Sequence, residues 1–235
     1  MLRTIKQLYG NKLGASDGEI GHIKDFYFDD RSWAIRYLVA DTGKWLPGRQ
    51  VLISPHSLPS LDPSGKVVRV NLTRQQIENS PSIESHKPVS RQYEEEYYRY
   101  YGWPDYWQGN ALWGMSGFPI LELPPKPLAS EPAIIGPQPE PEVHLRSMQA
   151  VNGYLLRMGP ETIGHLCDFM MDTRTWAIGQ LVVKIGHRLS GEEILMPTKQ
   201  VERVSYDEST AFAHPTGEAV EQSHTQDVPY EKAHR

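Results

Sequence analysis

An internal repeat constrains this chain more than any other feature of its sequence. Residues 2–39 align with residues 145–182 without a gap, and 16 of the 38 aligned positions are identical. Both copies contain the string D-F-x-x-D-x-R-x-W-A-I, whereas random pairing at average composition would give only a few matches. The chain therefore holds two copies of one folding unit. Their separation of 143 residues, from Leu2 to Leu145, is too long for a solenoid and indicates two tandem domains.

The copies diverge after residue 40, but a later part of the repeat can still be aligned. The string VLISPHSL at 51–58 corresponds to EILMPTKQV at 193–201, with one residue of slippage. Each copy is therefore expected to span about 80 residues, which suits a small domain. The expected parts of the chain are copy one over 1–86, a linker over 87–144, copy two over 145–228 and a tail over 229–235.

Each copy contains the pattern of a β-hairpin. Residues 19–28 and 34–41 are rich in β-prone side chains and flank the turn DDRSW, and copy two carries DTRTW at the same place. Two such runs around a short turn with Asp and Ser are typical of a hairpin. The apolar alternation breaks in the first strand of both copies, so we predict a β-bulge near Gly21 and near Gly164.

A short helix is predicted to close the first copy. Thr73 precedes residues 74–79 as a candidate N-cap, and Gln76 lies three residues later, which is the pattern of a capping box. Several short strands that end in a helix indicate a small barrel or curled sheet. The predicted fold class is mainly β: two small barrels, each with a short C-terminal helix, joined by an aromatic- and Pro-rich linker that contains one helix.

The two copies resemble the PRC-barrel family. The matching residues in copy one are G-E-I-G-x-I-x-D-F from Gly18, W-A-I-x-x-L-V from Trp33, L-I-S-P from Leu52 and V-x-V-x-L-T-R-x-x-I-x-N-S-P from Val68. Copy two keeps the first three parts, the third as L-M-P, and a degenerate form of the fourth. The resemblance covers the whole chain except the middle segment and the extreme tail.

The resemblance implies a binding or assembly module. The family's barrel forms the cytoplasmic part of the photosynthetic reaction centre H subunit and a domain of a ribosome-maturation factor, and it occurs in stand-alone bacterial and archaeal proteins. Neither specific role carries over to this chain, because it lacks the membrane helix of the first and the RNA-binding-type domain of the second. The family therefore predicts a non-catalytic bacterial interaction module.

Aromatic residues concentrate in the middle segment. Six of the twelve tyrosines lie within 93–106, and three of the six tryptophans lie within 103–113. Tyr and Trp combine a large apolar area with a polar group and dominate interface hot spots. The candidate binding residues are Tyr93, Tyr97, Tyr98, Tyr101, Trp103, Tyr106 and Trp107. Three readings remain open: packing on the chain's own barrels, a homo-oligomer interface, and contact with a foreign protein.

One helix and one extended stretch are expected in this segment. Residues 91–101 fit a helix, because Ser90 can cap its start and Gly102 and Pro104 can end it. From 119 to 141 there are eight prolines in 23 residues, which favours extended polyproline II.

His22 with Asp25, and His165 with Asp168, are the main candidates for other chemistry. A His and Asp pair can bind a metal or transfer a proton, but one pair per copy is too few for a closed metal site. The sole cysteine, Cys167, has a lysine as its counterpart in copy one, so the unit does not require a thiol there. Motifs of nucleotide, hydrolase and metalloprotease sites are absent. We therefore predict no catalytic residue, no metal and no cofactor.

Composition narrows the remaining classes of function. A net charge of −5 gives no electrostatic reason to expect tight non-specific binding to nucleic acid or anionic membranes. A single cysteine and the lack of a run of ~18–20 apolar residues indicate a cytoplasmic protein without a membrane span. We expect an interaction or assembly module. The alternatives are a small-molecule or chromophore carrier that binds between the barrels, and a ribosome- or RNA-associated factor.

Overall fold

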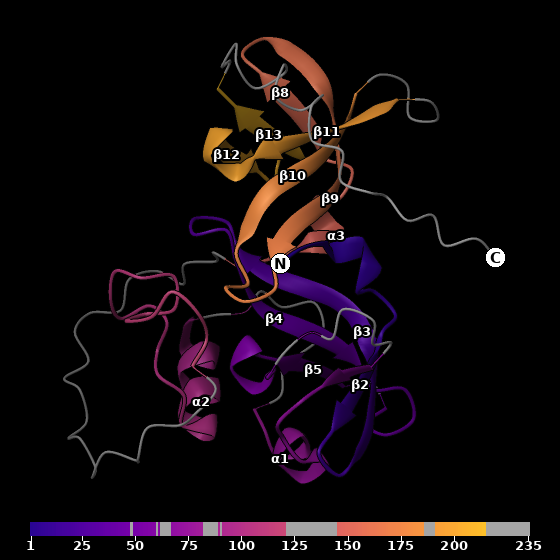
Figure 1. Ribbon diagram of the computed structural model, residues 1–235, viewed down its shortest axis with the longest axis vertical. Helices are drawn as coiled ribbons and strands as arrows, with labels where there is room; N and C mark the ends of the chain where they lie inside the picture. Colours follow the sequence, from indigo (N-terminus) through magenta and orange to yellow (C-terminus); the bar gives the residue numbers. More distant parts are fainter. Residues whose placement is uncertain are drawn as a thin grey trace. The chain divides into compact units, whose positions relative to one another are not determined.

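The computed structural model describes residues 1–47, 49–59, 61, 67–81, 89, 91–120, 145–185 and 191–214. The chain forms two compact units. The first unit consists of Met1–Ala150 together with Met171–Ile178, and the second consists of Val151–Met170 together with Gly179–Arg235. Each unit is built around a β-sheet (Figure 1).

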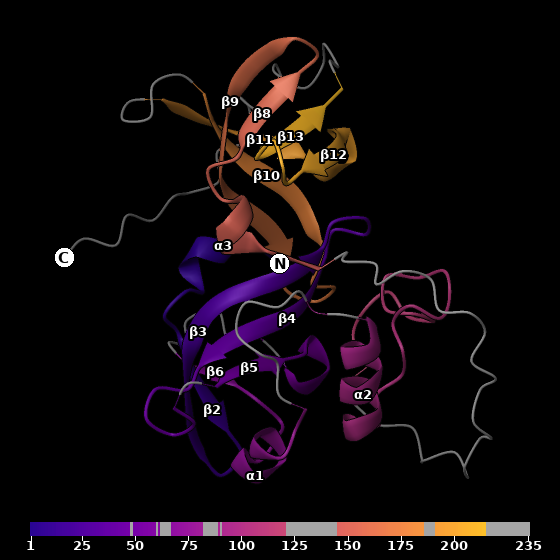
Figure 2. The same cartoon turned by 180° about the vertical axis from the view of Figure 1, so that it is seen from behind.

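The sheet of the first unit has the strand order β5-β4-β3-β2-β6, and β7 pairs with β3. Strands β2 and β6 pair in parallel, and the other neighbours pair antiparallel. Figure 2 shows the same strands from behind. The strands are β2 (Lys12–Ala15), β3 (Gly18–Asp29), β4 (Ala34–Asp41), β5 (Gln50–Ile53), β6 (Val67–Arg69) and β7 (Leu145–Ser147), and β1 (Leu2–Thr4) precedes them.

The sheet of the second unit repeats this order as β11-β10-β9-β8-β13, with β12 added beside β13. The bounds of β8 and β9 are those of β2 and β3 moved by 143 residues, and β8 pairs with β13 in parallel as β2 does with β6. The predicted mainly β class is confirmed, whereas the closure of each sheet into a barrel stays a prediction. The strands are β8 (Leu155–Met158), β9 (Glu161–Asp172), β10 (Ile178–Ile185), β11 (Glu192–Pro197), β12 (Val201–Ser205) and β13 (Thr210–Ala213).

The predicted bulges are present in both long strands. The register between β2 and β3 shifts so that Ile20 has no partner, and the register between β8 and β9 does the same at Ile163. The glycine beside each bulge allows a close backbone approach: a Cβ atom on Gly21 would lie 1.9 Å from the carbonyl oxygen of Asp41, and one on Gly164 would lie 2.2 Å from a carbonyl oxygen of β10. These positions therefore require glycine.

The two hairpin turns use the same hydrogen bonds. The Asp29 carboxylate accepts from the backbone N–H groups of Arg31 and Ser32, and Asp172 accepts from the backbone of the two equivalent residues. The turns end at Trp33 and Trp176, whose φ angles of 54° and 59° are rare for residues other than glycine. These aspartates therefore stabilise the two turns.

The first unit contains the tips of both hairpins. The backbone N–H of Ile35 donates to the carbonyl of Trp176 at 2.8 Å, and the N–H of Ile178 donates to the carbonyl of Trp33 at 2.7 Å. Because these residues are equivalent in the repeat, the two bonds are related by its pseudo-symmetry. The hairpin tip of copy two is thereby part of the first unit.

The helices of the first unit follow the sequence signals. In α1 (Arg74–Glu78), the Thr73 hydroxyl accepts from the Gln76 backbone and the Gln76 side chain accepts from the Thr73 backbone, so the capping box is confirmed. Helix α2 (Arg91–Tyr101) ends at Gly102, whose φ is 71°. Helix α3 (Met148–Val151) follows β7. The Ser90 cap, most of the proline-rich stretch, the second C-terminal helix and the tail lie outside the described residues.

Candidate binding site

The aromatic insert, residues 91–118, packs on the sheet of the first unit (Figure 1). Every residue of β4 from Ala34 to Ala40 is buried, whereas the equivalent strand β10 has exposed and half-buried positions. A strand is buried on both sides only where both faces of its sheet are covered. The insert supplies that second cover for β4.

A tyrosine of α2 satisfies the edge strand β5. The hydroxyl of Tyr97 donates to the carbonyl of Leu52 at 2.9 Å and accepts from the backbone N–H of Ser54 at 3.3 Å. Both groups belong to a strand edge that would otherwise be open to pairing with another chain. The ring of Tyr97 also meets the ring of Tyr37 in β4 edge to face, with centroids 5.4 Å apart.

A buried carboxylate joins the insert to β4. Glu94 of α2 is fully buried, and its Oε1 accepts from the hydroxyls of Tyr37 at 3.1 Å and Tyr106 at 2.7 Å. Its Oε2 lies 3.0 Å from Nη1 of Arg91. Burial raises the pKa of both tyrosines, so these hydroxyls remain donors at neutral pH. A buried carboxylate needs such partners, because an unpaired charge in the interior is costly.

Arg36 of β4 makes a second connection to the insert. Its guanidinium lies over the ring of Tyr106, 3.7 Å from the ring centroid, and donates to the carbonyl of Leu112 at 2.7 Å. It also lies 3.6 Å from the carboxylate of Asp29. Burial acts to raise the pKa of Asp29, but backbone hydrogen bonds from the turn and the charge of Arg36 lower it below its ordinary value.

His56 lies among the aromatic rings of the insert. Its ring stacks on Trp103, with centroids 5.5 Å apart and an interplanar angle of 25°, and meets Tyr98 and Trp113 edge to face. Its Nδ1 lies 2.9 Å from the carbonyl oxygen of Ile120. Burial lowers the pKa of His56 to about 4, so the ring is neutral near pH 7. Because a carbonyl only accepts, the proton is on Nδ1 and Nε2 has a free lone pair.

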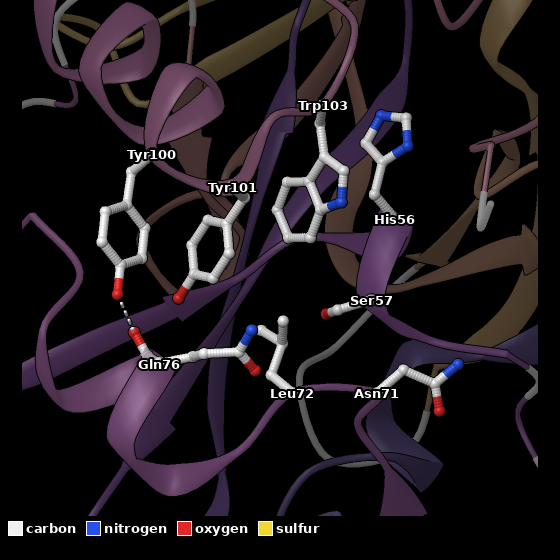
Figure 3. Close-up of a pocket in the computed structure, with 8 residues that line it drawn as sticks. All are labelled: His56, Ser57, Asn71, Leu72, Gln76, Tyr100, Tyr101 and Trp103. Carbon is white, nitrogen blue, oxygen red and sulfur yellow. Dashed lines mark hydrogen bonds between the residues drawn. The ribbon is translucent and has the colours of Figure 1, made fainter. Parts of the chain in front are cut away.

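A cavity of about 300 Å³ opens beside this histidine (Figure 3). Trp103 and Tyr101 stack in its wall with centroids 4.5 Å apart and an interplanar angle of 15°. The backbone carbonyl of Gln76 accepts from the hydroxyl of Tyr100 at 2.9 Å, which connects the end of α2 to α1 across the rim. The residues that line the cavity are His56, Ser57, Asn71, Leu72, Gln76, Tyr100, Tyr101 and Trp103.

The lining offers hydrogen bonds without formal charge. The described part of the lining contains two amides, two hydroxyl-bearing tyrosines, a serine, an indole and an imidazole, but no Asp, Glu, Lys or Arg. The Nε2 atom of His56 is buried and has no hydrogen-bond partner within the described part of the chain. Buried polar atoms are nearly always paired. The unpaired Nε2 is itself enclosed, so the polar side chains of the lining that are open to a ligand are those of Asn71, Gln76 and Tyr100.

The seven predicted binding residues belong to one cluster. Tyr97, Tyr98, Tyr101, Trp103 and Tyr106 are buried, and Tyr93 and Trp107 are half-buried. This burial agrees with the reading in which the aromatic residues pack on the chain's own sheet, and Tyr101 and Trp103 also line the cavity. A partner interface formed by the seven residues stays a prediction.

Five hydrogen-bonding residues of the cavity were not predicted as site residues: Tyr100 of α2 and four residues of the first copy. His56 and Ser57 follow the L-I-S-P motif, and Asn71 and Gln76 belong to the motif that ends the first copy. Gln76 was recognised only as part of a capping box. Their role depends on the docking of an insert that no local pattern predicts.

The candidate residues His22 and Asp25 have separate partners. Nε2 of His22 lies 3.9 Å from the carboxylate of Asp41, while Asp25 accepts from the hydroxyl of Ser147 and the backbone of Gln149. Burial raises the pKa of Asp25, and these hydrogen bonds oppose the rise. Among the residues with described positions, no group of three or more His, Cys, Asp or Glu could hold a metal ion.

Comparison with protein-family models and with curated proteins found no match for this chain. None of the helices that the structure describes has the length and apolar character needed to cross a bilayer.

Proposed function

We propose that this chain is a non-catalytic cytoplasmic binding and assembly module of the PRC-barrel type. The proposal combines the sequence motifs of the duplicated unit with the cavity that the aromatic insert forms on the first unit. The two β units serve as the scaffold, and the insert converts one of them into a receptor.

The difference between the two copies supports this division of roles. The short 3-10 helix η2 (Pro55–Ser57) supplies His56 and Ser57 to the cavity, whereas its equivalent η3 (Thr198–Gln200) has Lys199 and Gln200 at those positions. Copy two keeps the strands and the turn but not the residues that line the cavity. A scaffold shared by both copies, in which the described positions of copy two lack the residues that line this cavity, fits a binding function that arose after duplication.

The cavity is the single observation that carries the proposal. Its volume of about 300 Å³ lies at the lower end of the range for small-molecule sites. Its lining combines apolar rings with a few hydrogen-bonding groups, which is the usual composition of such sites. Among the lining residues that the structure describes there is no nucleophile–base pair and no pair of carboxylates, and this composition supports the proposal of a binding site.

Native mass spectrometry of the protein purified from its own host tests this function. The expected result is a bound mass that is lost when the protein is denatured, and that is reduced in a variant with a filled cavity, Asn71→Trp. An Asn79→Trp variant is the control, because Asn79 is exposed on the same unit but does not line the cavity. A chain that carries no small ligand and captures no specific protein would contradict the proposal.

The predicted homo-oligomer would require the exposed part of the insert. Met115 is 89% exposed and Phe118 is 54% exposed, and both lie in the loop that follows Trp113. Large apolar side chains with this exposure are candidates for contact with another chain. Size-exclusion chromatography with light scattering should show a lower mass for Met115→Ser/Phe118→Ser than for the wild type. Equal monomeric masses would remove this part of the proposal.

A further inference from the structure

We propose that the cavity of the first unit binds an uncharged planar aromatic or heteroaromatic molecule that both donates and accepts hydrogen bonds. This inference rests on the proposed binding function and names the class of its ligand. It follows from three properties of the lining: the absence of charge, the unused hydrogen-bonding groups and the ring-lined wall.

The lining disfavours a charged ligand. Its described residues include no Asp, Glu, Lys or Arg, and His56 is neutral near pH 7 because burial lowers its pKa to about 4. Burial also raises the pKa of Tyr101 to about 12, so its hydroxyl carries no charge. An ion that enters the cavity loses part of its hydration, and the described lining residues supply no counter-charge, which disfavours an ion relative to a neutral ligand. A neutral ligand avoids this cost.

Several hydrogen-bonding groups of the lining are unused. Such groups can donate or accept: the indole N–H of Trp103 donates, and no partner for it is found within the described ranges. The Asn71 side chain can do both, and the Nε2 of Gln76 can donate while its Oε1 is held by the capping box. Such a set of donors and acceptors matches a ligand that itself presents both kinds of group.

The shape of the wall favours a flat ring. Figure 3 shows Tyr101 and Trp103 side by side, with Leu72 and the side chain of Gln76 opposite them. Aromatic edges carry partial positive charge and attract the face of another ring. Leu72 adds an apolar surface to the opposite side, so a planar molecule contacts both sides at once.

Ligand-observed NMR on the full chain at pH 7.5 tests the inference with two probes of the same shape. Nicotinamide is neutral and donates and accepts through its amide, whereas nicotinate is an anion that only accepts. We expect nicotinamide to bind with a Kd in the millimolar range, as is usual for a small fragment, and at least about tenfold more tightly than nicotinate. Cyclohexanecarboxamide, which keeps the amide but is not planar, should bind more weakly than nicotinamide.

Two rim variants test the location without entering the core. Gln76→Glu keeps a residue that supports the capping box, but it removes the free donor and adds a charge. Its control is Gln75→Glu, which adds the same charge to the same helix away from the cavity. Asn71→Ala removes an exposed amide, with Asn79→Ala as its control. Loss of one hydrogen bond should weaken nicotinamide binding about fivefold in each rim variant, and the two controls should bind as the wild type does.

The outcomes separate this inference from the proposed function. Equal binding of nicotinate, or unchanged binding in both rim variants, would overturn the assignment of ligand class or place. Native mass spectrometry can detect a ligand in the cavity while nicotinamide shows no binding up to roughly 20 mM, about 20-fold above the expected Kd. In that case the proposed ligand class is wrong and the binding function stands. Absence of both signals would overturn both.

Discussion

Acidification should destabilise the first unit through His56. This residue is 2% exposed, and its pKa is lowered from 6.5 to about 4, chiefly by burial and also by the charge of Arg36, while the hydrogen bond to Ile120 acts in the opposite direction. Between these two pKa values the unfolded chain binds a proton that the folded chain does not. The contribution of neutral His56 is therefore fully present above pH 6.5 and is lost as the pH falls through 6.5 toward 4.

The size of the effect follows from the two pKa values. At 1.36 kcal/mol per pKa unit, the full difference corresponds to about 3 kcal/mol. About 2 kcal/mol of this is lost between pH 8 and pH 5, because the unfolded histidine is almost fully protonated at pH 5 whereas the folded one is still mostly neutral. Asp172, whose pKa is lowered to about 2, titrates below this window.

Urea unfolding followed by tryptophan emission measures this loss of stability in the first unit. All six tryptophans belong to the first unit, so the signal reports on that unit alone. The free energy of unfolding should fall by about 2 kcal/mol from pH 8 to pH 5 in the wild type. A His56→Gln variant should lose much less over the same range, even if it is less stable at pH 8.

A second histidine provides the control. The side chain of His22 is 51% exposed, and a His22→Gln variant should retain the pH dependence of the wild type. If His56→Gln and the wild type lose the same stability between pH 8 and pH 5, a buried neutral His56 is not the cause, and the charge argument for the cavity fails with it.

Three further predictions use the same urea measurement. Tyr97→Phe removes the hydroxyl that satisfies the edge of β5, so the free energy of unfolding should fall by about 1–2 kcal/mol. Tyr100→Phe, whose hydroxyl is at the exposed rim, should lower it by less than about 0.5 kcal/mol. Equal losses in the two variants would contradict the role of Tyr97. Gly21→Ala should lower the free energy of unfolding by about 3 kcal/mol or prevent folding. In the control Gly14→Ala, the added Cβ would lie 3.5 Å from the nearest side chain, so the loss should be about 1 kcal/mol or less. A tolerated Gly21→Ala would refute the close backbone approach. Thr73→Ala should cost about 1 kcal/mol through loss of the capping box, and no loss would show that α1 does not depend on it.

Features whose cause lies within a few residues could be predicted from the sequence. The glycine bulge in β3 and β9, the aspartate turns and the capping box at Thr73 each depend on local backbone chemistry. The repeat strengthened these predictions, because the same break in apolar alternation at Gly21 and at Gly164 is hard to explain by chance. Helix α2 could also be predicted from the sequence, because Gly102 marks its end.

The cavity could not be predicted, because its walls come from segments that are distant in the sequence. His56 and Trp103 stack only after the insert has docked on the sheet. Nothing near His56 in the sequence indicates that it is buried, since a histidine after L-I-S-P would be equally reasonable on the surface. The aromatic content of the insert predicted a contact surface, but the sequence could not decide whether that surface faces the chain itself or a partner.

The comparison of β4 with β10 explains why the aromatic insert docks on the first copy. Both strands descend from the same repeat position, yet β4 is buried on both faces and has Arg36 and Tyr37 where copy two has Gly179 and Gln180. Arg36 and Tyr37 are two of the residues that hold the insert, through Tyr106 and Glu94. Copy two lacks these attachment groups, so an identical insert would not dock there. Two substitutions on one strand, together with the insert, thus account for the difference between a bare β scaffold and one with a ring-lined cavity.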